Sequence, residues 1–178
     1  MTQVRRSTRE TEIEVTITAA GADATVTTGE PFLDHMLVTL ARYSGLGITI
    51  TARGDLRHHL VEDVAITLGE ALRRSVPATC RRYGERTVAM DDALVQAAVD
   101  VGGRFFYCGP LPSALYDHWM RSFADAARIT LHLRVLRGTD RHHVVEAAFK
   151  SLGLALREAL EDGGAQLSTK GAVVLEVT

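Results

Sequence analysis

The histidines are the residues whose spacing in this chain points most clearly to chemistry. Four of the seven form two adjacent pairs, and each pair is followed, after two apolar residues, by a glutamate: HHLVE at 58–62 and HHVVE at 142–146. In an α-helix, positions three and four residues apart lie on one face, so each glutamate lies on the same side as both imidazoles. Imidazole and carboxylate together suit divalent ions such as manganese, iron or zinc. The two motifs therefore predict metal ligands at His58, His59, Glu62, His142, His143 and Glu146.

A single histidine pair is usually a surface accident, but here the surroundings of the pair recur. Residues 57–73 read RHHLVEDVAITLGEALR, and residues 141–157, 84 positions later, read RHHVVEAAFKSLGLALR. Ten of the seventeen positions are identical without a gap, which indicates an internal repeat. The period is too long for a solenoid, so we interpret it as duplication of a half-domain, with halves at 1–86 and 87–178.

The pattern of apolar residues predicts that helices follow both pairs. Alternation over 12–18 predicts a strand, and apolar residues at helical spacing over 32–43 predict a helix capped by Gly45. The order of elements is βαβα-like in each half. The other expected elements are a short strand ending near Thr28, a strand at 46–54, a helix to about Ser75, two or three strands between 87 and 107, a helix at 113–127, a strand at 129–135, a helix to about Glu161 and a possible last strand at 173–177.

Composition narrows the class of protein. The 178 residues carry a net charge of −2 without a run of Lys and Arg, so nucleic acid is not an expected partner. The polar start of the chain is not a signal peptide, and no segment approaches the length of a membrane span, so no membrane partner is expected. Two cysteines, Cys80 and Cys108, have no metal-type spacing and favour a reducing compartment, the cytoplasm.

Two further histidines lie near these elements in the sequence. His35 sits in PFLDHML at the start of a predicted helix, and His132 sits in the predicted strand ITLHLRV. Read alone, each is more often a structural histidine with a satisfied hydrogen bond. The repeated motifs shift the interpretation of both toward metal ligands.

These residues together resemble the imidazoleglycerol-phosphate dehydratase family. The resemblance runs over nearly the whole chain and is specific, because HHxxE pairs occur together with DHM and STKG. The stretches that carry it are RRSTRETEIEV at 5–15, TGEPFLDHML at 28–37, HHLVED at 58–63, LHLRVLRGTDRHHVVEAAFK ending at Lys150, and STKG at 168–171.

The resemblance implies a fold, a cofactor and an assembly. The fold is α+β, with two similar half-domains from an internal duplication, each a sheet with helices packed on one face, like domain 2 of ribosomal protein S5. The cofactor is two Mn²⁺ per subunit, and the assembly is a homo-oligomer of 24 subunits built from trimers, with sites between subunits. The metal ligands that the resemblance implies are His35, His58, His59, Glu62, His132, His142, His143 and Glu146, and it leaves His118 outside the site.

The implied reaction dehydrates D-erythro-imidazole glycerol phosphate to imidazole acetol phosphate in histidine biosynthesis. Two metal ions that bind both ring nitrogens would favour the imidazolate, whose electron density expels the neighbouring hydroxyl. A base then removes the adjacent C–H proton, and the resemblance assigns this role to Glu10. It assigns binding of the substrate phosphate to Arg82, Arg104, Lys150, Ser168 and Lys170.

The sequence departs from the family pattern at several places. The segment GDLRHH before the first pair is about three residues shorter, and Leu60 replaces the usual threonine. Residues 89–92 read AMDD where PMDE is usual, and residues 102–105 read GGRF where SGRP is usual. We expect these changes to affect the loop that covers the substrate and the rate more than the chemistry.

Two alternative functions remain open from the residues. A dimetal hydrolase of small phosphate esters would use the ions to generate hydroxide, although such sites favour carboxylates over this many histidines. A non-catalytic paralogue would use the ligands only for metal-dependent assembly. A phosphatase assay separates the first alternative, and assembly without turnover of imidazole glycerol phosphate identifies the second.

Overall fold

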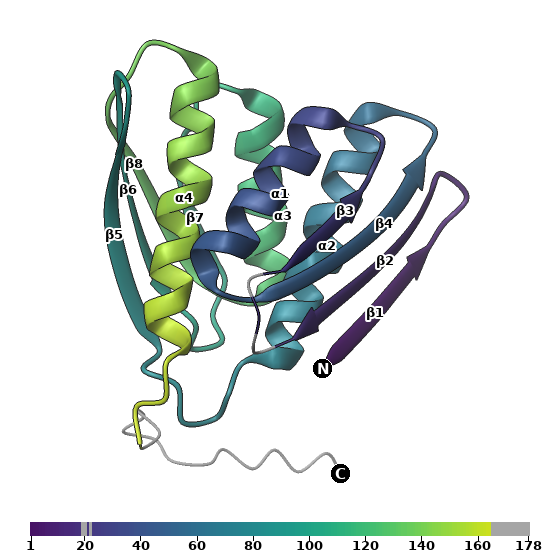
Figure 1. The fold of residues 1–178 in the computed structure, drawn as a ribbon, viewed down its shortest axis with the longest axis horizontal. Coiled ribbons are helices and arrows are strands. Elements are labelled where there is room, and N and C mark those ends of the chain that lie inside the picture. Colours follow the sequence, from purple (N-terminus) through teal and green to yellow (C-terminus); the bar gives the residue numbers. More distant parts are fainter. Residues whose placement is uncertain (19–20, 22, 165–178) are drawn as a thin grey trace, which may run out of the picture.

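The computed structural model of the protein describes residues 1–18, 21 and 23–164. Two four-stranded sheets lie on the outside, and four helices lie between them (Figure 1). The predicted α+β fold, with two similar halves and helices on one face of each sheet, is confirmed. The first half contains β1 (Thr2–Ser7), β2 (Thr11–Thr18), β3 (Ala24–Thr27), α1 (Pro31–Ser44), β4 (Gly47–Gly54) and α2 (Arg57–Ser75), and the second contains β5 (Tyr83–Met90), β6 (Ala93–Asp100), β7 (Phe106–Cys108), α3 (Ala114–Ala127), β8 (Thr130–Arg137) and α4 (Arg141–Leu160).

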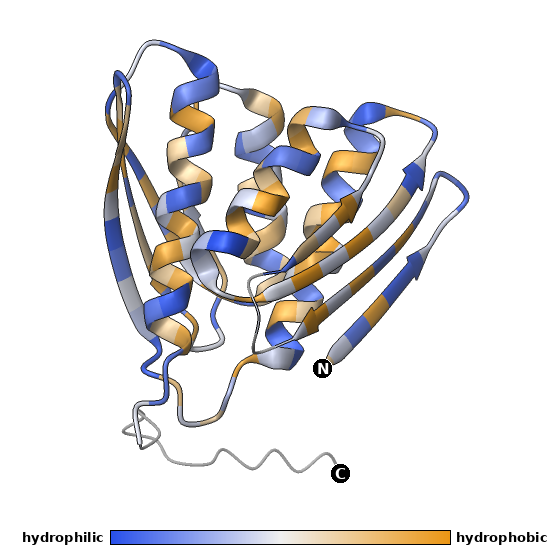
Figure 2. Ribbon diagram, in the orientation of Figure 1, coloured by the Kyte–Doolittle hydropathy of each residue, from blue (hydrophilic) through white to orange (hydrophobic). Residues whose placement is uncertain are grey.

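The two sheets have the same topology. Their strand orders are β1-β2-β4-β3 and β5-β6-β8-β7, with the last pair parallel and the other pairs antiparallel. Side chains alternate between the faces, so Ile13, Val15 and Ile17 of β2 are buried against the helices. The corresponding alternation of apolar and polar residues is visible along the strands in Figure 2. In residues 1–18, 21 and 23–164, no helix is long and apolar enough to cross a membrane.

Two strand boundaries differ from the sequence-based expectation. The strand β1 was not expected, because Thr2–Ser7 has Val4 as its one strongly apolar residue and buries no face fully. The strand β5 begins at Tyr83, before the expected start at 87, because residues 83–86 pair with residues 97–100 of β6, and Gly84 lies under α4. A Cβ at Gly84 would lie closer to the Ala155 carbonyl oxygen than atoms can pack, so this glycine lets the strand meet the helix. The possible strand at 173–177 lies outside the described residues.

The helices pair across the two halves rather than within them. The helix α2 of the first half packs against α3 of the second, and α4 of the second packs against α1 of the first. Both contacts depend on a glycine of the internal repeat: an added Cβ would lie 2.5 Å from the Phe123 carbonyl oxygen at Gly69, and 2.7 Å from the Tyr43 Cβ at Gly153. These glycines are 84 positions apart, so the duplication preserves the same close helix contact twice.

We expect the Gly69→Ala substitution to lower the free energy of unfolding by about 1–3 kcal/mol, the usual cost of overpacking. The direction of the change in the free energy of unfolding is informative, because Gly→Ala at an open helical position stabilises by up to about 1 kcal/mol. Urea unfolding of the parent and the variant measures the change. Gly153→Ala serves as the matched variant in the other helix pair and should be destabilised similarly. A stabilised Gly69→Ala variant would show that the helices do not need this close approach.

Candidate metal centre

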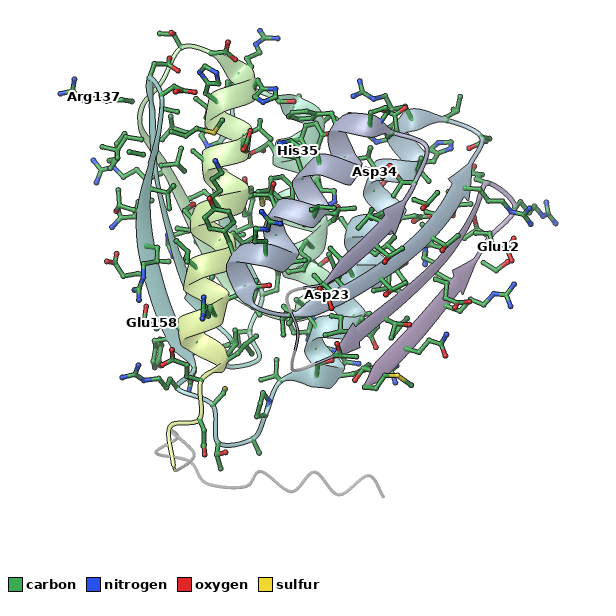
Figure 3. The ribbon with its side chains drawn as sticks, viewed as in Figure 1. Glu12, Asp23, Asp34, His35, Arg137 and Glu158 are labelled. Atoms are coloured by element: carbon green, nitrogen blue, oxygen red, sulfur yellow. The ribbon has the colours of Figure 1, made fainter. Side chains whose placement is uncertain are left out.

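The first cluster of potential metal ligands lies where α1 meets α4. We call His35, His142 and Glu146 the first cluster, because their donor atoms all lie within 4.8 Å of one another. The His35 Nε2 is 3.4 Å, and the His142 Nε2 3.1 Å, from the same carboxylate oxygen of Glu146. Figure 3 shows His35 on the side of α1 that faces α4. The structure therefore joins a ligand predicted from DHM to two ligands predicted from HHVVE.

Neighbouring side chains stabilise the ionised form of the Glu146 carboxyl group. Burial alone would raise the pKa of this carboxyl group, but the hydrogen bond from Lys150 and the nearby His35 lower it below its ordinary value. The Lys150 Nζ is 3.0 Å from the Glu146 Oε1, one helical turn away. Glu146 is consequently a buried, ionised carboxylate that faces two imidazoles.

The second cluster lies where α2 meets α3 and comprises His58, Glu62 and His118, whose donor atoms also lie within 4.8 Å of one another. The His118 Nε2 is 3.1 Å from the Glu62 Oε1, and the rings of His58 and His118 stack with centroids 5.2 Å apart. The His118 Nε2 is shielded from solvent and has no hydrogen-bond partner in the described part of the chain. A buried nitrogen beside a carboxylate without a hydrogen bond is the arrangement that a cation between them would satisfy.

His118 is a candidate metal ligand that the sequence interpretation left out. The helices α1 and α3 correspond at a spacing of 83 residues, which aligns Asp34–His35 with Asp117–His118. Both aspartates accept a backbone hydrogen bond from the residue six positions earlier, Thr28 for Asp34 and Leu111 for Asp117. The repeated dipeptide Asp-His at this spacing was the signal available in the sequence.

The structure does not bring His132 to either cluster. His132 lies on β8 opposite Ala98, between Leu131 and Leu133, which are buried on the helix side of the sheet. Because side chains alternate along a strand, the His132 ring is exposed on the outer face, 5.3 Å from the Phe106 ring. Within one chain, His118 and not the predicted His132 lies beside the first histidine pair.

The second histidine of each pair lies outside its cluster and contacts a carboxylate of a connecting loop or turn. The His59 Nδ1 is 3.0 Å from an Asp55 carboxylate oxygen, and the His143 Nδ1 is 2.8 Å from an Asp92 carboxylate oxygen. These hydrogen bonds raise the pKa of both imidazoles above the ordinary value. The rings of His142 and His143 are perpendicular, so one helix turn presents imidazoles in two directions.

The predicted base lies beside the second histidine of the first pair. Glu10 stands in the turn between β1 and β2, and its carboxylate is 3.6 Å from the His59 Nδ1. Asp63 of α2 fixes this hairpin, because its carboxylate accepts hydrogen bonds from Arg6 and Thr11. The Glu10 side chain is 56% exposed, so it is accessible to a small molecule.

The predicted phosphate-binding residues divide into two groups. Lys150 lies at the first cluster, whereas Arg82 lies near the other end of α4, where its backbone N–H donates to the Ala159 carbonyl oxygen. Arg82 also forms two hydrogen bonds with Asp100 and lines a cavity of about 430 Å³. This cavity is lined also by Arg73, Arg128, Gly102 and Gly103, next to Arg104 in the sequence, while Ser168 and Lys170 lie outside the described residues.

Known proteins resemble this chain in sequence and in structure. Residues 28–156 match the family model described as imidazoleglycerol-phosphate dehydratase. Proteins of that name from Anaeromyxobacter sp. and Pyrobaculum calidifontis are 43% and 45% identical, cover 95% of this chain, and are themselves covered to 91% and 98%. The crystal structure of the Pyrococcus furiosus enzyme superposes with a TM-score of 0.85 at 42% identity, covering 96% of this chain and 100% of that one.

A solved structure of lower sequence identity also superposes on this chain. The Staphylococcus aureus imidazoleglycerol-phosphate dehydratase superposes with a TM-score of 0.80 at 30% identity, covering 90% of this chain and 98% of that one. Three observations point to the same family: the two sheets with helices paired across the halves, the His and Glu clusters, and these matches over almost the whole length. The resemblance noted in the sequence is confirmed, and the chain belongs to the imidazoleglycerol-phosphate dehydratase family of hydro-lyases.

Proposed function

We propose that this protein dehydrates D-erythro-imidazole glycerol phosphate to imidazole acetol phosphate in histidine biosynthesis, with two Mn²⁺ per chain. The observation that carries the proposal is the pair of related clusters, each with two imidazole nitrogens and one carboxylate oxygen. This donor set suits Mn²⁺, although it would also accept other borderline divalent ions. The residues that would hold the ions are His35, His142 and Glu146 in the first cluster, His58, Glu62 and His118 in the second, and His59 and His143 beside them.

The chemistry would be divided between the metal ions and the chain. The bound ions would supply Lewis acidity toward the imidazole ring of the substrate, which favours its deprotonated form. Glu10 would remove the C–H proton, because it is a half-exposed carboxylate beside His59. Lys150, paired with Glu146, would place a cation at the first cluster for the phosphate or for the developing negative charge.

We further propose that the complete site lies between copies of the chain, in a 24-subunit homo-oligomer built from trimers. Three donors leave each cluster short of the four to six ligands that such ions take. From His142 to Ala159, beside Arg82, the helix α4 is about 26 Å long at 1.5 Å per residue. A substrate smaller than a tripeptide spans at most about 10 Å. The phosphate-binding arginines and the clusters of one chain therefore cannot serve the same substrate molecule, but those of two chains can.

The outer face of the second sheet offers apolar area for such contacts. Tyr83, Phe106 and Leu136 are large hydrophobic residues that are exposed there. An interface with another subunit would cover these side chains. Cys80 and Cys108 are both free, which supports our proposal that the protein works in the reducing cytoplasm.

The experiment that tests the proposed function is a direct assay of the purified manganese form with imidazole glycerol phosphate. Formation of imidazole acetol phosphate supports the proposal, and a generic phosphate ester run in parallel should remain intact. Turnover of the ester without dehydration would instead favour the hydrolase alternative. Ordered assembly with neither reaction would favour the non-catalytic paralogue.

Metal removal gives a second prediction. We expect a chelator to abolish dehydration and to reduce the particle size measured by light scattering, because metal binding would be coupled to assembly of shared sites. Added Mn²⁺ should restore both. Added Mg²⁺ is the control and should restore little, since it prefers oxygen ligands to imidazole. Full activity after complete chelation would contradict the proposal.

A further inference from the structure

The two hairpin turns that face the histidine pairs are counterparts in the duplicated fold. The turn between β1 and β2 ends at Glu10, directly before the central strand β2, and the turn between β5 and β6 ends at Asp92, directly before the central strand β6. Each turn thus carries a carboxylate beside the second histidine of a pair, 3.6 Å from His59 in the first half and 2.8 Å from His143 in the second. The two carboxylates nevertheless have different surroundings.

In the second half, Asp92, the carboxylate of the turn, accepts several hydrogen bonds. One oxygen of Asp92 accepts from the Thr139 N–H, the Thr139 hydroxyl and the Asp140 N–H, at 2.7, 2.9 and 3.2 Å. The other oxygen is the partner of the His143 Nδ1. Together these four hydrogen bonds fix the Asp92 carboxylate in place.

In the first half, the carboxylate nearest to the His59 Nδ1 comes from a residue outside the hairpin turn. Asp55 lies 3.0 Å from the His59 Nδ1, closer than Glu10, and its carboxylate also accepts a hydrogen bond from the neighbouring Leu56 N–H. The residue 84 positions after Asp55 is Thr139, which has no carboxylate. The carboxylate beside the second histidine therefore comes from different places in the two halves. In the first half it is Asp55, just before α2, and in the second half it is Asp92, in the turn between β5 and β6.

We propose that Asp55 and Asp92 are positioning residues with one shared role, which rests on the proposed function. Each holds the Nδ1 proton of the second histidine, so the ring is fixed and its Nε2 is left as the metal-binding atom. A carboxylate behind a ligating imidazole both orients the ring and strengthens it as a ligand. In the first half, this arrangement has a second effect, because Asp55 relieves Glu10 of the hydrogen bond to His59 and leaves it available for proton transfer.

The first test is the affinity for Mn²⁺, measured from free Mn²⁺ by electron paramagnetic resonance on the full-length protein. Asp92→Ala and Asp55→Ala should each weaken binding at the affected sites about 10- to 100-fold, as expected for loss of such a partner. The matched control is Glu14→Ala, which removes a carboxylate that is hydrogen-bonded to Gln3 on the outer face of the first sheet, away from both histidine pairs. Equal weakening by the control would assign the effect to charge alone and overturn the proposal, as would unchanged affinity in both alanine variants.

The second test uses the metal-free protein and is independent of activity. Nitrogen-15 NMR of the histidine rings should show His59 and His143 protonated on Nδ1 when neutral. Asp55→Ala should return His59, and Asp92→Ala should return His143, to a mixture of tautomers. Asp55 is exposed and has few contacts, so this variant should fold even if Asp92→Ala does not. Nε2-protonated rings in the parent would overturn the proposal, whereas correct tautomers without dehydration would count against the proposed function alone.

Discussion

We expect the His118→Ala variant to retain about one Mn²⁺ per chain where the parent binds about two, because the second cluster loses one of its nitrogen ligands. Dehydration should fall about 10³-fold or more, since a displaced metal ion removes several kcal/mol of transition-state stabilisation. Elemental analysis after gel filtration measures the metal, and a steady-state assay measures kcat. The folded state should be kept, because the imidazole is partly exposed and its Nε2 makes no hydrogen bond among the described residues.

The matched control is His132→Ala, the other histidine for which sequence and structure disagree. His132 is exposed on the outer face of the second sheet, so its removal should leave the metal content near that of the parent. A change in particle size in this variant would indicate a role in contacts between subunits. Loss of one metal ion from His132→Ala, with full metal content in His118→Ala, would reverse the assignment made here.

Glu10→Gln should lower kcat about 10²- to 10⁴-fold, the usual contribution of a general base. Glutamine keeps the size and hydrogen-bonding capacity of the side chain but cannot accept the substrate proton. KM should change little if the carboxylate acts mainly in the transition state. Metal content and assembly should match those of the parent, because Asp55 rather than Glu10 makes the closer contact with His59.

Glu12→Gln is the matched control for Glu10. Glu12 lies two residues away on β2, where its carboxylate is paired with Arg5 and Arg53 on the outer face of the first sheet. Its loss should change the stability little, as for exposed ion pairs, and leave kcat unchanged. A Glu10→Gln variant with the kcat of the parent would remove Glu10 from the mechanism.

The sequence predicted best those features that repeat at a regular local spacing. The helices after each histidine pair, the cap at Gly45 and the duplication all follow from periodicity within about twenty residues, and the structure confirms them. The strand β1 was not predicted, because its residues bury no continuous apolar face. Its position depends on pairing with β2. Strand pairing of this kind is decided by tertiary contacts that no local pattern records.

The candidate site was harder to predict because its residues meet through contacts between halves. Nearness in sequence suggested His132, which is ten residues before His142, yet strand alternation directs His132 outward. His118 is 24 residues before His142 and joins neither it nor its helix, but pairs with ligands on α2 instead. Only the packing of α3 on α2 brings this histidine to Glu62, and helix packing partners are not encoded in residue spacing.

The crossed helix pairs also bear on the ancestry of the chain. Each cluster takes one histidine from one half and a histidine with its glutamate from the other. A half-length polypeptide could therefore not have built either cluster alone, but two copies related by a two-fold axis would have built both at once. Such a homodimer would already have been metal-binding before gene fusion joined its subunits. Fusion would then have allowed the sequences of the two turns to diverge, so that one carries the proposed base Glu10 and the other carries Asp92.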